Sequence, residues 1–340
     1  MEFEKIIPEC ENSPVGAVIK NKQFINYLTK SINYIYGVKG TELTFPGPQP
    51  VSIERKDFTK LQQYIYFTSV KLDGVRFLMY FIRDKNERSQ CIIVNRALNF
   101  FNINIKCEEN IYNGTLLDGE VIFNKTDKKW YFYIHDALML CGNKINKLTH
   151  SVRLSDTKSC IQTFIDNNSD IKNSLNIVVK EFYPFNKFNE FVENVYDKSI
   201  NNDGIIFMPE NLPVISGTQY SMLKWKPENK HTFDFLIKEA ELGFEVFVYH
   251  MGNIKQFANI HNKTEEGKTF IENVKKMDKY KNECIVECSF NKEISNFTPL
   301  LIRTDKTHPN SLRTIERTLF NINEDIKIKD FAELLEKQEE

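Results

Sequence analysis

Two strand-like runs separated by two turn residues constrain the fold of this chain more than any other feature. Residues 64–70 and 75–82 are both rich in aromatic and β-branched side chains, which favour β-strands. Asp73-Gly74 lies between the runs and is a common hairpin dipeptide. We therefore predict two antiparallel strands that pair as a hairpin, with Lys71 on a rigid element at its mouth.

Lys71, at the end of the first run, has two interpretations. A lysine amine becomes a nucleophile when desolvation or nearby cations lower its pKa, and Arg76 is positioned to be one such cation. The alternative is an ordinary turn flanked by solvated charges. The six residues from Lys71 to Arg76 do not decide between the two.

The composition is that of a soluble globular protein with room for two domains. The chain has 340 residues, of which 41% are hydrophobic and 27% charged, and both fractions are ordinary. Its formal net charge is -1, so a nucleic-acid partner must be met through local contacts. The seven cysteines are scattered without a Cys-x-x-Cys pair, and we interpret them as reduced thiols of an intracellular protein.

Two features argue against export and membrane insertion. The N-terminus, Met1-Glu2-Phe3-Glu4, is acidic where a signal peptide would be basic. The longest strongly apolar run, residues 77–82, is far too short to cross a bilayer. We expect a soluble protein that is not secreted by the usual route.

Carboxylates inside otherwise apolar strands mark a candidate site. A buried carboxylate is costly unless it is paired or bound to a cation, although a solvent-facing carboxylate is the common alternative. Asp118 and Glu120 lie in the predicted strand 115–123, Asp136 follows His135 in the predicted strand 130–140, and Asp203-Gly204 precedes the apolar run 205–208.

Helices and lysine-bearing strands complete the first two thirds of the chain. Apolar residues recur at helical spacing over 22–36, and Gly37 follows as a stop, which predicts a structural amphipathic helix. Residues 150–175 are predicted to be helical and polar. A strand over 177–182 would carry Lys180, and alternation places Lys224 and Lys226 on one face of a strand. Solvation is the default interpretation for two such lysines.

After Pro227 the sequence changes to short strands. Their number and spacing, with one helical excursion, fit a small β-barrel such as an OB-fold. A capped terminal helix is predicted after Asp330. The predicted strands are 232–237, 244–249, 284–290 and 300–303, and the excursion is 262–282.

Together these residues supply what an attack on the α-phosphate of a nucleoside triphosphate requires. A desolvated amine serves as the nucleophile, and carboxylates hold one or two divalent metal ions. Cationic side chains neutralise the phosphates as pyrophosphate leaves.

Six short motifs follow one another along the chain, namely Lys71-Leu-Asp-Gly-Val-Arg76, Asp118-Gly-Glu120, His135-Asp136, Asp203-Gly-Ile-Ile-Phe207, Lys224-Trp-Lys-Pro227 and Arg303-Thr-Asp-Lys-Thr-His-Pro-Asn310. Their order resembles that of the covalent nucleotidyltransferases, the superfamily of mRNA capping enzymes and ATP- or NAD-dependent polynucleotide ligases. The last motif resembles the capping guanylyltransferases rather than the ligases. The segment 46–58 is similar to the capping enzyme of Chlorella virus.

The resemblance implies an α+β fold with two domains. Residues 1–228 would form a nucleotidyltransferase domain with antiparallel sheets, of the ATP-grasp-like or ligase type. The C-terminal helix 326–340 would pack back on it, and residues 229–325 would form an OB-fold β-barrel domain.

The resemblance also implies the activity of an mRNA guanylyltransferase. Lys71 would attack GTP to give a Lys71-GMP intermediate and pyrophosphate. The 5′-diphosphate end of an RNA would then accept the GMP and form the GpppN cap. Closure of the barrel domain would serve the first step and its reopening the second, and Mg²⁺ or Mn²⁺ would be the metal ion.

Individual roles follow from the same resemblance. Glu120 and Asp203 would hold the metal ion. His135 stands where the family commonly has a phenylalanine that stacks on the base, and an imidazole can stack too, although a buried, hydrogen-bonded histidine is the alternative. The ribose would be contacted by Arg76 and Glu120, and guanine O6 by Lys180. The phosphates would be contacted by Arg96, the α-phosphate by Lys224 and Lys226, and the β- and γ-phosphates by Arg303, Asp305 and Lys306. Asp234 would be a further acidic position, and the supporting residues would be Asp73, Gly74, Asp118 and Asp136.

Two other functions stay open. An ATP-dependent RNA or DNA ligase would use the same chemistry through a Lys71-AMP intermediate, although Pro309-Asn310 and Lys180 argue against it. A degenerate member of the family could bind nucleotide or RNA as a scaffold, although all the expected charged positions are filled.

The expected partner is 5′-diphosphate RNA, without membrane contact, and the chain would act as a monomer. There is no room for a phosphatase domain and no glycine-rich methyltransferase fingerprint. RNA triphosphatase and cap methyltransferase activities are therefore expected on separate chains. The sequence leaves the nucleus and the cytoplasm open as locations, with a viral factory as the site if the source is a virus.

Overall fold

The chain divides into two compact units by its own contacts. The structure, a computed structural model, describes residues 16–39, 45–105, 107–167, 175–199, 202–292, 295–304 and 306–339. The first unit comprises Met1–Ser52, Phe58–Trp225 and Leu334–Glu340, and the second comprises Ile53–Asp57 and Lys226–Glu333.

A large and mostly antiparallel sheet, called sheet A, forms the base of the first unit. Its strand order is β1-β6-β5-β4-β7-β8-β10, and β9 pairs with β8. Apart from the parallel pair of β8 and β10, its strands pair antiparallel. The strands are β1 (Gly16–Val18), β4 (Val75–Arg83), β5 (Ser89–Asn95), β6 (Phe100–Ile103), β7 (Thr115–Asn124), β8 (Lys129–Leu140), β9 (Asn143–Lys144) and β10 (Asn176–Val179).

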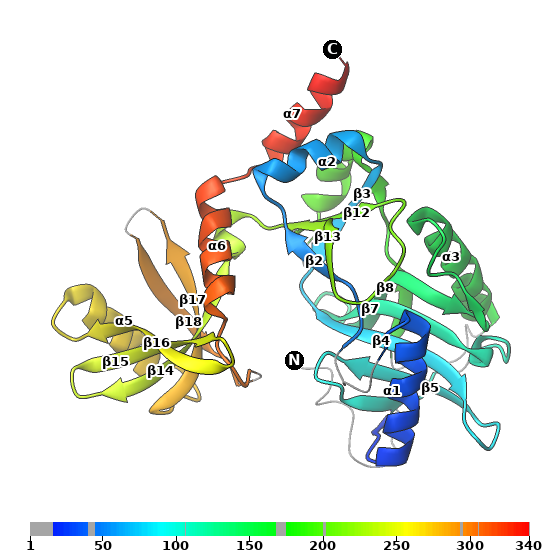
Figure 1. Ribbon diagram of the computed structural model, residues 1–340, viewed down its shortest axis with the longest axis horizontal. Coiled ribbons are helices and arrows are strands. Elements are labelled where there is room, and N and C mark those ends of the chain that lie inside the picture. The colour runs from blue at the N-terminus through cyan, green and yellow to red at the C-terminus, as the bar shows by residue number, and fades with distance from the viewer. Residues whose placement is uncertain are drawn as a thin grey trace. The chain divides into compact units, whose positions relative to one another are not determined.

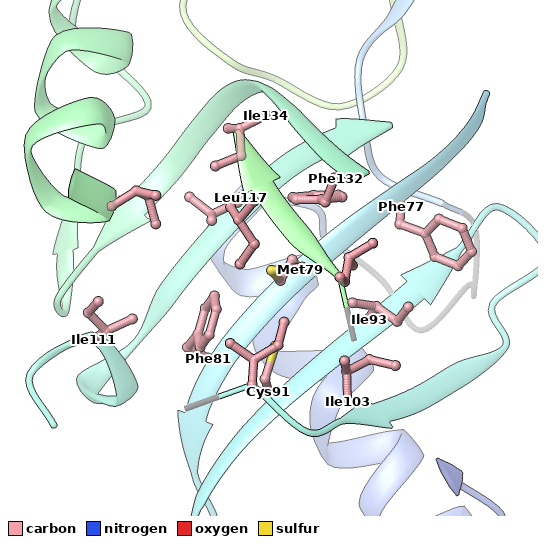
Figure 2. Close-up of a cluster of buried hydrophobic side chains, with 14 of the residues drawn as sticks. Phe77, Met79, Phe81, Cys91, Ile93, Ile103, Ile111, Leu117, Phe132 and Ile134 are labelled. Atoms are coloured by element: carbon pink, nitrogen blue, oxygen red, sulfur yellow. The ribbon is translucent and has the colours of Figure 1, made fainter. Parts of the chain in front are cut away.

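Alternation along β4 divides the core of the first unit into two layers. Phe77, Met79 and Phe81 point to one face of sheet A and pack in the cluster that Figure 2 shows. Leu78 and Tyr80 point to the other face and pack against α1 (Lys22–Tyr36), which lies across β4 and β5 in Figure 1. Because β4 is buried on both faces, its sequence is a nearly continuous apolar run.

The helix α1 begins and ends where the sequence predicts. Asn21 caps its N-terminus by accepting a hydrogen bond from the Gln23 backbone N–H at 3.0 Å. Gly37 ends the helix with a φ of +71°, a left-handed conformation that glycine adopts readily. Leu28 and Ile32 are buried against sheet A. The predicted helix over 22–36 is confirmed, and its apolar face packs on sheet A as predicted for an amphipathic helix.

The second sheet of the first unit, sheet B, contains Lys71. Its strand order is β11-β3-β12-β13-β2. β3 pairs with β11 and β12, whereas β4 pairs with β5 and β7 in sheet A. The predicted hairpin is therefore wrong, because strand propensity marks both strands but not their partners. The strands of sheet B are β2 (Gln49–Ser52), β3 (Tyr66–Leu72), β11 (Tyr183–Pro184), β12 (Asn202–Pro209) and β13 (Thr218–Trp225).

Asp73-Gly74 carries the chain from sheet B to sheet A. A Cβ atom on Gly74 would lie 2.6 Å from Ile122 Cγ1 and 2.7 Å from Glu120 Cγ, both on β7. The missing side chain therefore lets the chain cross directly over β7. Residues 180–182 make the crossing in the other direction, between β10 and β11.

Three α-helices follow in the described part of the first unit, of which α3 packs on β8 and β10. It lies within the predicted helical segment 150–175. No helix in the described part of the chain is long and apolar enough to span a bilayer. The three are α2 (Phe58–Gln63), α3 (His150–Asn167) and α4 (Phe188–Phe191).

The second unit is built on one antiparallel sheet with the strand order β16-β15-β14-β17-β18. Phe233, Phe235 and Phe244 lie in its core. This sheet does not close into a barrel, because β16 and β18 lie at opposite edges and no strand pair joins them among the described residues. The elements are β14 (Thr232–Ala240), β15 (Gly243–His250), β16 (Asn253–His261), α5 (Glu265–Lys275), β17 (Glu283–Asn291), β18 (Asn296–Ile302) and α6 (Leu312–Glu324), followed by α7 (Ile328–Glu339), whose residues from Leu334 on group with the first unit.

Candidate active site

Lys71 lies opposite a β-bulge that brings a carboxylate to it. The register between β3 and β12 shifts here, so that Asp203 and Gly204 on β12 together oppose Lys71 on β3. Gly204 has a φ of +128°, which a residue with a side chain rarely adopts. Asp203 Oδ2 forms an ion pair with Lys71 Nζ, and the two side chains are only 15% and 22% exposed. The bulge explains why Asp-Gly precedes an apolar strand at this point.

Arg76 and Asp118 form a buried ion pair on sheet A. Arg76 donates from Nε to Asp118 Oδ1 at 2.8 Å and from Nη2 to Oδ2 at 2.5 Å. Its Nη1 donates to the Pro48 carbonyl oxygen at 2.5 Å. The Asp118 side chain is fully buried. The sequence predicted Arg76 as a cation acting on Lys71, but the structure balances its charge with Asp118.

A second bulge directs His135 toward the same carboxylate. The register between β7 and β8 shifts by one residue and leaves His135 as the extra residue of β8. His135 Nε2 lies 3.1 Å from Asp118 Oδ1, and the Tyr36 hydroxyl of α1 donates to Asp118 Oδ2 at 3.4 Å. Burial would raise the pKa of Asp118, but Arg76 and His135 hold it far below its usual range. Asp118 is therefore an anion that orients three side chains, and stacking of His135 on a base stays a prediction.

Lys180 lies at the crossing between the two sheets, beyond the last residue of β10 and not on the predicted strand. Its backbone N–H donates to the Ile134 carbonyl oxygen at 2.8 Å. Burial lowers the pKa of Lys180 to about 8; the negative charge of Glu120 counteracts this shift, and the positive charge of Lys71 adds to it. Glu120 is itself paired in register with Arg76 across β7 and β4. The structure thus brings these predicted site residues into one electrostatic environment.

Asp136 is paired with Arg153, a residue that the sequence analysis missed. Arg153 donates from Nε to Asp136 Oδ1 at 2.7 Å and from Nη2 to Oδ2 at 2.8 Å, and both side chains are buried. The pair fixes α3 to sheet A. His150, also on α3, lies with its Nε2 3.2 Å from the carbonyl oxygen of His135. This helix therefore supports the bulge that positions the His135 ring.

Four further predicted residues lie on strands or directly after them, and one of these, Lys226, groups with the second unit. Lys224 is on β13 and shares a face of sheet B with Lys71, because the register aligns Lys224 through Ile206 with Ser69, two residues before Lys71. Lys226 comes after the last residue of β13, so the predicted strand does not reach it. Arg96, directly after β5, and Asp73, at the crossover, are exposed.

In the second unit, Asp234 on β14 binds the residues of the last motif. Arg303 Nη1 lies 3.2 Å from Asp234 Oδ1, and Lys306 Nζ lies 3.8 Å from Oδ2. Asn310 donates from its backbone N–H to the Asp234 carbonyl oxygen at 2.7 Å, and its Oδ1 accepts from the Asp234 N–H at 3.0 Å. Asp305 lies outside the described residues. Asp234 therefore orients the cations of this motif.

The residues predicted to hold a metal ion fit the way nucleotide enzymes bind Mg²⁺. Such sites use one or two carboxylates and complete the coordination with substrate phosphates and water. Glu120 and Asp203 can supply these two carboxylates. Across the described ranges no group of three or more His, Cys, Asp or Glu side chains could hold a metal ion by itself. The two lysines, Lys71 and Lys180, and the two carboxylates, Glu120 and Asp203, lie at the junction of sheets A and B. Such a set of charges suits the chemistry of phosphates.

The chain belongs to the mRNA capping enzyme family. A family model described as the mRNA capping enzyme catalytic domain matches residues 10–228, and one described as the mRNA capping enzyme C-terminal domain matches residues 218–332. These matches confirm the family predicted from the ordered motifs, and with it an enzyme of the nucleotidyltransferase type.

Individual relatives agree with the family. The mRNA-capping enzyme subunit alpha of Schizosaccharomyces pombe is 26% identical over 95% of this chain and 87% of that protein. The protein of the same name from Saccharomyces cerevisiae is 24% identical over 86% and 78%. The mRNA-capping enzyme of Danio rerio is 26% identical over 86% of this chain and 50% of that protein. Among solved structures, the ATP-dependent DNA ligase of bacteriophage T7 aligns with a TM-score of 0.40 and 14% identity over 78% of this chain and 98% of that one, which is too low to relate individual strands.

Proposed function

We propose that this chain is an mRNA guanylyltransferase that works through a covalent Lys71-GMP intermediate. The observation that carries the proposal is the environment of Lys71. It lies on a rigid strand in contact with Asp203, and its charge influences Lys180, in a chain of the mRNA capping family. GTP is the proposed nucleotide.

In the first step, Lys71 Nζ forms a bond to the α-phosphorus of GTP. The bond from that phosphorus to the oxygen bridging to the β-phosphate breaks, and pyrophosphate leaves with the electron pair. The attacking amine must lose its proton, and Asp203, which contacts Nζ, can accept it and pass it to water. Lys224, Lys226 and Arg96 would neutralise the phosphate oxygens. A bound Mg²⁺ or Mn²⁺, held by Glu120 and Asp203, would add to that neutralisation.

The base would be chosen by Lys180. A protonated lysine donates hydrogen bonds and accepts none, so it favours the O6 carbonyl of guanine over the amino group of adenine. His135 would stack on the base, and Arg76 with Glu120 would contact the ribose. This preference separates the proposal from the alternative of an ATP-dependent ligase.

In the second step, an oxygen of the terminal phosphate of a 5′-diphosphate RNA attacks the phosphorus of the Lys71-GMP adduct. The phosphorus–nitrogen bond breaks, the GpppN cap is released, and the lysine amine takes up a proton. Arg303 and Lys306, together with Asp305, would act in the first step, on the β- and γ-phosphates that leave as pyrophosphate. Asp234, which pairs with both cations, would act by orienting them.

We infer that residues 1–228 with the helix 326–340 form the nucleotidyltransferase domain and that residues 229–325 form an OB-fold. The second inference is supported by the five-stranded antiparallel sheet of the second unit, since OB-folds are five-stranded barrels that are often partly open. It is also supported by the match of residues 218–332 to the capping enzyme C-terminal domain.

Partners and location follow from the same proposal. Relatives named subunit alpha support a division of labour, with RNA triphosphatase and cap methyltransferase on other chains. The six cysteines in the described residues are free thiols, which supports a reducing compartment, nucleus or cytoplasm; Cys10 lies outside the described residues. We expect the chain to act as a monomer.

The test is to incubate the pure protein with α-labelled GTP or ATP and Mg²⁺ or Mn²⁺, without RNA, and to look for label on the denatured chain. GMP should label the native protein and the control Lys60→Ala but not Lys71→Ala. Label from ATP instead would support a ligase. No label from either nucleotide would support a scaffold.

A further inference from the structure

The exposed face of α1 carries two aromatic rings with a lysine between them. Gln23, Tyr27, Lys30 and Tyr34 recur at helical spacing and are exposed; we call these four residues the α1 surface. Tyr27 is 42% exposed and Tyr34 is 74% exposed, although the opposite face of α1 is buried against sheet A. Exposed rings in one row on a helix can mark an interaction surface.

Cations accompany these rings. Lys144 Nζ lies 3.9 Å from the centre of the Tyr34 ring, within the range of a cation–π contact. The helix itself, Lys22–Tyr36, contains two lysines and no carboxylate. The α1 surface is therefore locally basic in a chain whose formal net charge is -1.

A groove continues the α1 surface at the N-terminal end of the helix. It has a volume of about 280 Å³ and lies between Gln23, Phe24 and Tyr27 of α1 and the turn between β4 and β5. The rings of Phe24 and Tyr27 are stacked, 6.3 Å apart and 11° from parallel. From the turn, Lys85, Asn86 and Arg88 line this α1 groove.

Two carboxylates face the α1 groove or flank it. Asp84 accepts hydrogen bonds from Arg88 Nε at 2.8 Å and from Gln90 Nε2 at 2.8 Å, so its charge is already neutralised. Glu87, at the tip of the turn, is exposed. Lys85 and Arg88 offset these two charges, and the helix side adds Lys22.

The helix α1 runs from the candidate active site, which its buried face contacts, to the α1 groove. At the C-terminal end of α1, Tyr36 donates to Asp118, the residue that holds Arg76. Midway, the Ser31 and Tyr80 hydroxyls are 2.8 Å apart. The α1 surface runs from Gln23 to Tyr34, a rise of about 16 Å along the helix axis, so it extends beyond the space that one nucleotide needs.

We propose that the α1 surface and the α1 groove bind the first nucleotides of single-stranded RNA that follow the 5′ end. The inference rests on the proposed function, in which the diphosphate acceptor is the end of an RNA. A capping enzyme must accept many sequences, and stacking on tyrosine rings is tolerant of sequence because every base has a π face. Lys30, between the two rings, and Lys144, beside Tyr34, attract the phosphates. An acidic peptide would use the cations but would leave the rings without a role.

The test compares GMP transfer to a short 5′-diphosphate RNA of about three nucleotides with transfer to one of about 20 nucleotides, long enough to cover the surface. The double variant Tyr27→Ala with Tyr34→Ala should raise KM for the longer RNA about tenfold, which corresponds to about 1.4 kcal/mol. Formation of the GMP adduct and KM for the short RNA should stay unchanged. Lys30→Ala should make KM for the longer RNA less sensitive to salt.

The matched control is Tyr64→Ala with Tyr220→Ala, two rings of the first unit that are 65% and 66% exposed and lie away from α1; it should behave like the native protein. An unchanged KM for the longer RNA in the Tyr27 and Tyr34 variant would overturn the proposal, as would an equal rise for both RNAs. Loss of binding to an acidic peptide with RNA transfer intact would assign the surface to a protein partner instead.

Failure of the proposed function can be told apart from failure of this inference. If native protein forms no adduct with GTP, binding of a fluorescent RNA of about 20 nucleotides can be followed directly by anisotropy. About tenfold weaker binding by the Tyr27 and Tyr34 variant would still support the RNA surface. Equal binding would overturn it.

Discussion

Replacing Asp118 with asparagine removes the charge that balances Arg76 without changing the size of the side chain. Asp118 is fully buried and Arg76 is 9% exposed, so the guanidinium would keep its charge with little access to water. Removing one partner of a buried ion pair costs about 3–5 kcal/mol. We expect Asp118→Asn to lower the free energy of unfolding of the first unit by that amount.

The two tryptophans make this loss measurable in the full-length chain. Trp130 on β8 and Trp225 on β13 both lie in the first unit, so their fluorescence in a urea titration reports the unfolding of that unit. The control is Glu109→Gln. Glu109 pairs with Arg83 at 2.6 Å but is 73% exposed, and an exposed pair contributes at most about 1 kcal/mol.

The stability lost in Asp118→Asn should depend on pH with a defined sign. The pKa of Asp118 is far below its usual range in the folded protein, so its stabilising contribution is complete above the unfolded pKa of about 4 and declines as the pH falls below it. The difference between native protein and Asp118→Asn should therefore narrow below about pH 4. A loss of under about 1 kcal/mol at pH 7 would refute this account of the buried pair.

Three further predictions concern other residues of the site. Lys180→Met should stabilise the first unit at pH 7 by about 3 kcal/mol, because burial lowers the pKa of Lys180 to about 8. This gain in stability should fade between about pH 8 and 10.5, as the unfolded lysine also loses its proton. Equal urea midpoints of the variant and the native protein at pH 7 would contradict this prediction. Gly74→Ala should lower the free energy of unfolding by about 1–3 kcal/mol and reduce the yield of labelled adduct, because the new Cβ atom would lie 2.6–2.7 Å from atoms of β7. An unchanged urea midpoint would show that the crossover has room for a side chain. Arg303→Ala should slow formation of the GMP adduct about a hundredfold while sparing transfer from a preformed adduct, and equal loss in both half-reactions would count against its role at the leaving phosphates.

Local sequence signals predicted those elements whose pattern depends on packing against one or two neighbouring elements. The helix over 22–36 was predicted to the residue, because a buried stripe and Gly37 fix its length. β16 was missed because nearly all of its residues are exposed, so it shows no alternation. α6 was also missed, although Ser311 caps it and Leu312, Ile315, Leu319 and Ile322 have helical spacing, so in this case the signal was present.

The geometry of the site depends on contacts that a sequence does not display. Lys71, Glu120 and Lys180 were predicted as members of one site, and the structure brings them together at the junction of two sheets. The pairing of β3 and β4 was predicted wrongly, since Asp73-Gly74 has the same composition whether it turns a hairpin or crosses between sheets. Arg153 could not be found, because its role comes only from its pairing with Asp136 on another element.

The crossover at Asp73-Gly74 also limits how this chain can evolve. Most surface turns absorb an extra residue at little cost, but here both ends are fixed in different sheets. One inserted residue would reverse the direction of every later side chain of β4. Arg76 would then point into the layer of Phe77 and Met79, and those two side chains would point toward α1. We therefore expect a change in length between Lys71 and Arg76 to be more damaging than most changes of residue type there.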